Sequence, residues 1–158
     1  MKNRSDQGVS AIEFALVLPL LLILVFGIIE FSFLLFDKAV ITNASREGAR
    51  AGIVYSTDGE NPIQVSDDTI RAVVRDYVND DGGSSSLISL GSAGPQTLQD
   101  GDIAITRADP DGDGVEDLTV RVTYTYTFLL FPNMAALVGG NFQLLTVPLI
   151  GETLMRME

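Results

Sequence analysis

The stretch from Phe14 to Phe36 reads FALVLPLLLILVFGIIEFSFLLF and contains one charged residue, Glu30, in 23 positions. An α-helix rises 1.5 Å per residue, so a helix of this length measures about 35 Å and can cross a hydrocarbon core of about 30 Å. The stretch therefore predicts a single membrane-spanning helix. Glu30 lies near its distal end, and we expect its carboxylate to reach the lipid headgroups by snorkelling.

The charges before this run predict how the helix is oriented. Lys2 and Arg4 precede it, and Asp6 dilutes the basic bias that they create. A basic flank favours the cytoplasmic side, so the short N-terminus is expected inside the cell and the rest of the chain outside.

The alternative to a membrane-spanning helix is a cleaved secretory signal peptide, whose apolar core usually has about 7–15 residues and ends at a small-x-small site. The run here is longer and continues as GIIEFSFLLFDK, which favours a retained helix.

The composition of the whole chain excludes several classes of function. The 158 residues include 10 Lys and Arg against 21 Asp and Glu, which gives a net charge of −11. This is the wrong sign for binding nucleic acid. The chain has no His and no Cys, so it lacks Ser-His-Asp and Cys-His nucleophiles, His or Cys metal sites, and disulfides. Only a Ser/Lys pairing with Lys38 or scattered carboxylates could support catalysis, and we expect no enzyme.

A second carboxylate, Glu13, stands just inside the start of the apolar run. A charge within lipid costs about 2–3 kcal/mol or more, and a nearby cation offsets that cost. Cleavage after Gly8 would expose the α-ammonium group of Val9, which could neutralise Glu13 in the same chain or in a neighbouring copy. The alternative is an unpaired carboxylate at the membrane boundary, near the positive end of the helix dipole.

Two separate motifs in the first third of the chain resemble a known family. Gly8, followed five residues later by Glu13 and then by an apolar helix, resembles the class III prepilin motif, in which a membrane aspartic peptidase cuts after the glycine. The run GVSAIEFALVLPLL from Gly8, together with NASREGARA from Asn43, resembles the TadE-like pilus proteins of the tight-adherence system. The C-terminal part, with an alternating strand, an apolar Pro-containing loop and a final strand, is similar too.

The resemblance implies a function and a division of the chain. Residues 1–8 would be a leader peptide, residues 9–55 a transmembrane and extended helix, and residues 56–158 an extracytoplasmic α+β domain. The protein would be a minor pilin or pseudopilin, a component or assembly factor of a tight-adherence type IV pilus that serves adhesion, surface attachment and biofilm formation. Its partners would be other pilin subunits, a prepilin peptidase and the bacterial inner membrane, with the C-terminal domain in the periplasm or on a surface pilus.

Small residues recur every four positions beyond the apolar run, at Ala44, Gly48 and Gly52. On a continuing helix they share one face and allow close approach of a neighbouring helix. We therefore assign these three residues, with Glu13, to subunit assembly. The alternative is that the two glycines mark the end of the helix. The charged residues between them are expected to be solvated, with Glu47 paired to Arg50.

The remaining sequence predicts a small acidic α+β domain. Apolar residues from Ile70 to Val78 have helical spacing after Ser66 or Asp67 as N-cap, and the helix is expected to stop at Asp81-Gly82-Gly83. The stretch Leu118–Phe128 alternates between apolar and polar residues, which predicts a half-buried antiparallel strand. Weaker strands are expected at 87–90 and 103–106. A last strand around 144–150 contains Pro148, which favours a sheet edge or a bulge.

One acidic loop resembles half of a calcium site. Asp109, Asp111 and Asp113 alternate along DPDGDG, and alternate carboxylates can converge on a hard cation. The twelfth position holds Val120 where an EF-hand needs Glu, although Glu116 or Asp117 could complete a different loop. The alternative, which we favour, is a hairpin tip whose Asp side chains cap their own backbone. A second function therefore stays open: a bitopic membrane protein with an acidic, calcium-dependent binding module.

Overall fold

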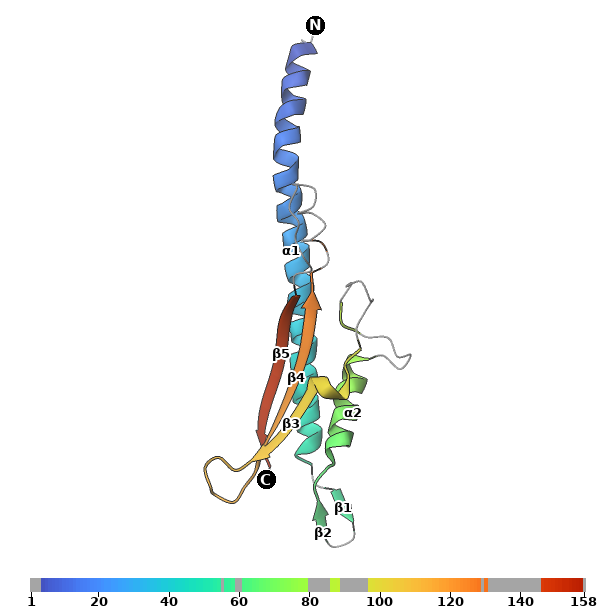
Figure 1. Ribbon diagram of the computed structural model, residues 1–158, viewed down its shortest axis with the longest axis vertical. Coiled ribbons are helices and arrows are strands. Elements are labelled where there is room, and N and C mark those ends of the chain that lie inside the picture. Colours follow the sequence, from blue (N-terminus) through green and yellow to red (C-terminus); the bar gives the residue numbers. More distant parts are fainter. Residues whose placement is uncertain are drawn as a thin grey trace.

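The structure is a computed structural model that describes residues 4–54, 56–58, 61–79, 86–88, 97–128, 130 and 146–157. The chain begins with one long helix and continues into a small domain (Figure 1). The elements in chain order are α1 (Arg4–Gly52), β1 (Ser56–Asp58), β2 (Asn61–Ile63), α2 (Asp67–Val78), the 3₁₀ turn η1 (Asp100–Asp102), β3 (Ile103–Ala108), β4 (Asp117–Thr127) and β5 (Thr146–Arg156). This α+β arrangement confirms the predicted fold class.

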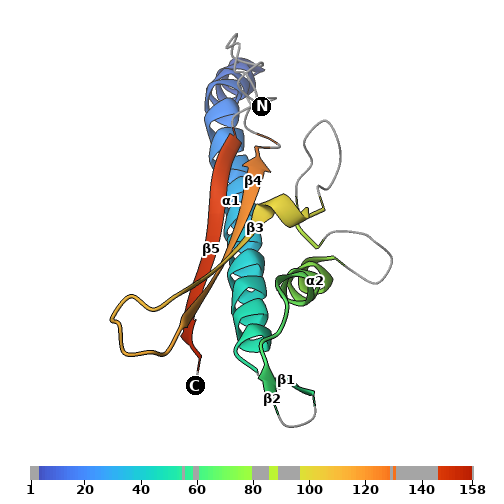
Figure 2. The ribbon, with the colours of Figure 1, turned by 60° about the horizontal axis from the view of Figure 1, so that its bottom comes forward.

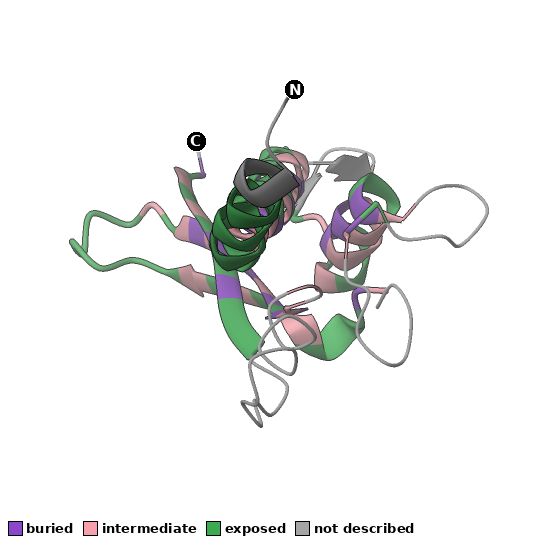
Figure 3. Cartoon of the chain, turned by 90° about the horizontal axis from the view of Figure 1, so that it is seen from above, coloured by how far each residue is buried: buried purple, intermediate pink, exposed green. Residues whose placement is uncertain are grey.

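Helix α1 has two parts with different surroundings. Its N-terminal half extends beyond the rest of the molecule, whereas its C-terminal half lies against the sheet and α2 (Figure 1). The helix passes through Pro19 without interruption. Seen along the helix from above, the projecting half is exposed and the buried residues lie where the domain meets the helix (Figure 3).

The three longer strands form an antiparallel sheet in the order β3-β4-β5. Burial along β4 alternates as predicted: its even-numbered residues from Leu118 to Tyr126 are buried and face the helices. Strand β5 lies at the edge of the described sheet, with Pro148 opposite Thr125. This confirms the edge position predicted from the proline. Figure 2 shows the three strands side by side across α1.

Helix α2 closes the core on the side of β3 and β4 (Figure 2). Its N-cap is Ser66, whose hydroxyl accepts a hydrogen bond from the backbone N–H of Thr69 at 3.3 Å, as the sequence predicts. The apolar positions Ile70, Val74 and Val78 are fully buried. The helix ends at Val78, before the predicted stop signal, which lies outside the described residues.

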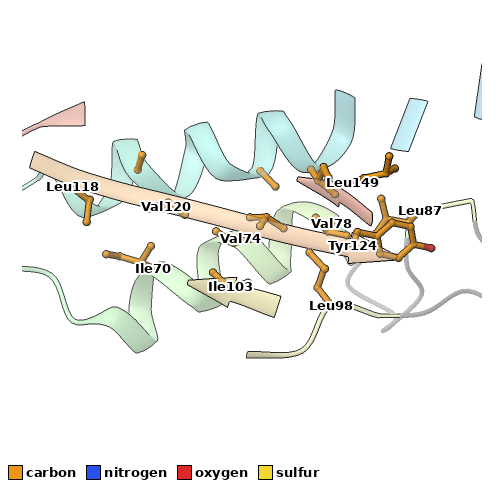
Figure 4. Close-up of a cluster of buried hydrophobic side chains, with 14 of the residues drawn as sticks. Ile70, Val74, Val78, Leu87, Leu98, Ile103, Leu118, Val120, Tyr124 and Leu149 are labelled. Carbon is orange, nitrogen blue, oxygen red and sulfur yellow. The ribbon is translucent and has the colours of Figure 1, made fainter. Parts of the chain in front are cut away.

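The core lies between α1, α2 and the inner face of the sheet (Figure 4). The largest fully buried apolar side chains in this cluster are Tyr126, Ile41, Ile70, Leu118, Val74, Val78, Val120 and Val122. Of the predicted strand at 87–90, only residues 87 and 88 are described. Leu87 is buried in the same cluster. The apolar loop after β4 falls outside the described residues except for Leu130.

Candidate functional site: the junction of helix and domain

The N-terminal half of α1 presents an apolar surface that nothing in the described chain covers. Most of its large side chains between Val9 and Ile29 are exposed. Among the described residues one helix, α1, is both long enough and apolar enough to cross a membrane. Such a helix is compatible with a single-pass membrane protein. Glu13 lies on this half of the helix and is exposed, and Gly8 and Val9 lie within the same continuous helix.

Glu30 marks the end of this exposed half. Its side chain is 1% exposed, and its two carboxylate oxygens accept hydrogen bonds from the Tyr126 hydroxyl at 2.7 Å and from the Leu130 backbone N–H at 2.6 Å. The expectation that Glu30 would snorkel to the headgroups is therefore wrong. A buried carboxylate must be hydrogen-bonded, and the domain supplies both donors.

The partner of Glu30 is itself held firmly in the domain. The ring of Tyr126 is buried and makes an edge contact with Phe128, with the ring centroids 5.5 Å apart. Burial raises the pKa of the Tyr126 hydroxyl, and its hydrogen bond to the Glu30 carboxylate raises the pKa further. The hydroxyl therefore stays protonated and remains a donor to Glu30.

A second buried carboxylate, Asp37, lies two turns further along α1. One of its oxygens accepts a hydrogen bond from the Ile88 backbone N–H at 2.8 Å, and Oδ2 has no hydrogen-bond partner among the described residues. Burial raises the pKa of Asp37 to about 6, and the bond from Ile88 opposes this shift. Glu30 and Asp37 together show that the domain packs on α1 from Glu30 onward, against the buried side of residues 30–52.

The small-residue face at Ala44, Gly48 and Gly52 is filled by the chain's own domain. A Cβ atom at Gly48 would lie 2.5 Å from a methyl group of Val74, and one at Gly52 would lie 2.4 Å from a methyl group of Leu118. Ala44 is fully buried. The face does allow close approach, as predicted, but its occupants are α2 and β4. The sequence interpretation that a neighbouring subunit docks there is corrected accordingly.

Strand β5 also packs closely on α1, here against the helix backbone, at a glycine that the sequence analysis did not single out. A Cβ atom at Gly151 would lie 2.6 Å from the carbonyl oxygen of Ile41. On either side of this contact, the Ser45 hydroxyl lies 2.8 Å from the Thr153 hydroxyl, and the Lys38 ammonium group donates to the carbonyl of Ile150. In the structure β5 extends from Thr146 to Arg156, past the predicted end at residue 150, so the sequence pattern did not indicate this approach.

Most of helix α1 matches a known protein family. Residues 8–50 match the model of one family, described as TadE-like protein. This segment resembles TadE-like proteins. No curated protein and no solved structure matches the chain.

The TadE-like segment covers both halves of α1 and stops before the sheet begins. It contains the predicted cleavage position, the exposed apolar surface and the two buried carboxylates at the junction with the domain. It also contains Arg46, Glu47 and Arg50, of which Glu47 and Arg50 form the predicted ion pair at the surface. This pair lowers the pKa of the Glu47 carboxyl through its hydrogen bond with Arg50.

The acidic loop lies outside the TadE-like segment. Asp109, Asp111 and Asp113 each place a carboxylate oxygen within 4.8 Å of the others, whereas Asp117 begins β4 and is not part of this group. The Asp109 carboxylate accepts hydrogen bonds from the backbone N–H groups of Gly112, Asp113 and Gly114. Arg156 forms ion pairs with Asp111 and Asp113.

These contacts give the loop's carboxylates partners from within the chain. Hydrogen bonds from backbone N–H groups, chiefly that of Gly114, lower the pKa of the Asp109 carboxyl, and the positive charge of Arg156 lowers this pKa further. Gly112 and Gly114 both have positive φ, at 71° and 87°, which suits a tight turn. The geometry therefore favours the hairpin interpretation that the sequence left open beside calcium.

A calcium titration of the detergent-solubilised full chain tests this interpretation. We expect millimolar calcium to leave the melting temperature unchanged, because Arg156 already supplies positive charge to the loop. We expect Asp109→Ala to lower the melting temperature, because three backbone donors lose their acceptor. Heat release on calcium addition that is abolished by Asp111→Asn would instead establish a metal site.

Proposed function

We propose that the protein is a membrane-anchored minor pilin or pseudopilin, a structural subunit or assembly factor of a tight-adherence type IV pilus. The observation that carries the proposal is the match of residues 8–50 to the TadE-like family along a helix whose first half is exposed and apolar. The role is structural: the helix anchors the subunit and meets other pilin subunits, and the domain is displayed outside the cytoplasm. Adhesion, surface attachment and biofilm formation would follow from the pilus.

The proposal includes processing by a prepilin peptidase between Gly8 and Val9. The TadE-like match begins at Gly8, and the residues on both sides of the bond are exposed. Cleavage would leave a new ammonium group at Val9, one helical turn before Glu13. That group would neutralise the Glu13 carboxylate in the same chain or in a neighbouring subunit, where an unpaired charge in lipid is costly.

We predict that the mature chain begins at Val9, which N-terminal sequencing or intact-mass measurement of the membrane-extracted protein would show. Gly8→Val should block maturation, because a branched side chain replaces the glycine at the cut.

Glu13→Val should permit cleavage but reduce piliation, because the Val9 ammonium group loses its partner. Normal piliation in a correctly inserted Glu13→Val variant would remove the assembly role of that residue.

The alternative function is a bitopic membrane protein with an acidic binding module that depends on calcium. The three carboxylates within 4.8 Å of one another are the observation that favours it. In this case, the mature chain would keep residues 1–8 and the calcium titration would raise the melting temperature. The N-terminus of the mature chain therefore separates the two functions without requiring a known partner.

A further inference from the structure

The surface of α1 exposes no charge between Glu13 and Lys38. Both of these residues are exposed, and they are 25 positions apart. The charged residues between them are Glu30 and Asp37, which are 1% and 0% exposed. A helix of 25 residues measures about 38 Å. An uncharged surface of this length suits a bilayer, whose hydrocarbon core measures about 30 Å and whose full thickness is about 40–45 Å.

A bilayer centred on this stretch has Glu13 in one headgroup layer and Lys38 in the other, because their separation exceeds the core and is smaller than the full thickness. A lysine is favourable at this depth, since its ammonium group can meet lipid phosphates. An ammonium group has three donors, and the carbonyl of Ile150 accepts from one of them. Two donors of Lys38 are therefore available for a phosphate.

The strands beside α1 are uncharged up to the same level. Ile150 receives the Lys38 ammonium group, and Gly151 packs on the helix backbone less than one turn further along. The next residue of β5, Glu152, is the first charged residue of that strand and forms an ion pair with Arg121 on β4. The helix and these two strands therefore change from uncharged to charged at one level.

This end of the sheet differs from the rest of an acidic protein. The sequence from Val122 to Gly151 contains no charged residue, although 20% of the whole chain is charged. Among its described residues, Val147 and Ile150 of β5 are both apolar and each 36% exposed. Phe36 of α1 is 46% exposed. Apolar side chains without nearby charge are stabilised at the boundary of headgroups and acyl chains.

We propose that the uncharged end of the sheet, up to Ile150, enters the headgroup layer of the membrane that α1 crosses, with Lys38 bound to a lipid phosphate. The inference rests on the membrane-anchored role proposed above. Phe36 of α1 and Ile150 of β5 contact lipid, whereas the ion pair between Arg121 and Glu152 stays in water. This second contact holds the domain at one depth and in one orientation around α1.

Single tryptophans test the contact, because the chain has no natural tryptophan. The full chain is placed in vesicles of phosphatidylcholine and phosphatidylglycerol that contain brominated lipid, which quenches nearby tryptophan. We expect Ile150→Trp to be quenched several-fold more than Leu154→Trp, an exposed control on the same face of β5 and about 13 Å further along the strand. Equal quenching at the two positions would overturn the proposal.

Leu24→Trp separates this proposal from the membrane anchor on which it rests. Leu24 is 58% exposed on the apolar half of α1, and lipid should quench a tryptophan there. Quenching of Leu24→Trp without quenching of Ile150→Trp would overturn the lipid contact of the sheet and leave the anchor intact. No quenching of Leu24→Trp would contradict both.

A charge variant tests the role of Lys38. In the Ile150→Trp background, Lys38→Gln should reduce the quenching about twofold, because the phosphate loses its cation. Glutamine keeps a donor for the Ile150 carbonyl, and circular dichroism shows whether the domain is folded. The matched control is Arg46→Gln, which removes an exposed cation about two turns further along α1 and should leave the quenching unchanged. Equal effects of the two variants would overturn the proposal.

Discussion

Gly151→Ala is expected to lower the melting temperature of the detergent-solubilised protein by about 5–10 °C, as measured by circular dichroism. The added methyl group would lie 2.6 Å from the oxygen and 2.8 Å from the carbon of the Ile41 carbonyl, and 2.9 Å from the backbone nitrogen of Thr42. These atoms belong to the helix backbone and cannot rotate away. Strand β5 would have to move off α1, and such overpacking costs about 1–3 kcal/mol.

The matched control for this prediction is Gly101→Ala. A Cβ atom at Gly101 meets nothing within 4 Å, and its backbone does not have a positive φ. The control therefore adds the same methyl group without the clash. A displaced β5 should also separate the hydroxyl of Ser45 on α1 from that of Thr153 on β5, which lie beside the same contact. Equal melting temperatures for the two variants would show that α1 and β5 are not closely packed in solution.

The parts of the fold that could be predicted are those encoded by local patterns. The alternation in β4 predicted both the strand and its buried face, because side-chain direction in a strand depends only on parity. Ser66 predicted the start of α2 because an N-cap acts on residues two or three positions away. Similarly, the pairing of Glu47 with Arg50 followed from their helical spacing.

The parts that could not be predicted depend on contacts between distant segments. Glu30 and Tyr126 are 96 positions apart in the chain, so their hydrogen bond has no local sequence pattern. From the sequence one could infer only that a carboxylate in an apolar run is costly. Snorkelling was one of several ways to avoid that cost. The spacing of Ala44, Gly48 and Gly52 predicted a close neighbour but carried no information about which one. In the acidic loop, Arg156 lies 43 positions from Asp113, and the DPDGDG pattern does not reveal it.

Glu30→Leu is expected to destabilise the domain by about 2–4 kcal/mol, because the Tyr126 hydroxyl and the Leu130 N–H would lose their acceptor inside the protein. Tyr126→Phe should cost less, since Glu30 then keeps the bond from Leu130. Thermal unfolding of the solubilised chain measures both values. The control is Glu152→Leu, which breaks an ion pair with Arg121 between side chains that are about half exposed. Such a surface pair is worth about 0–1 kcal/mol.

The double variant Glu30→Leu/Tyr126→Phe separates a hydrogen bond from general disturbance of the core. If the two groups bond directly, the loss of stability in the double variant should be smaller than the sum of the two single losses, with a coupling of about 0.5–3 kcal/mol. A carboxylate that snorkelled into the headgroups would give no coupling with Tyr126, and Glu30→Leu would then leave the domain as stable as before. Because Glu30 lies where the exposed apolar helix meets the domain, this coupling would also show that the membrane anchor and the displayed domain form one rigid unit, with no flexible linker between them.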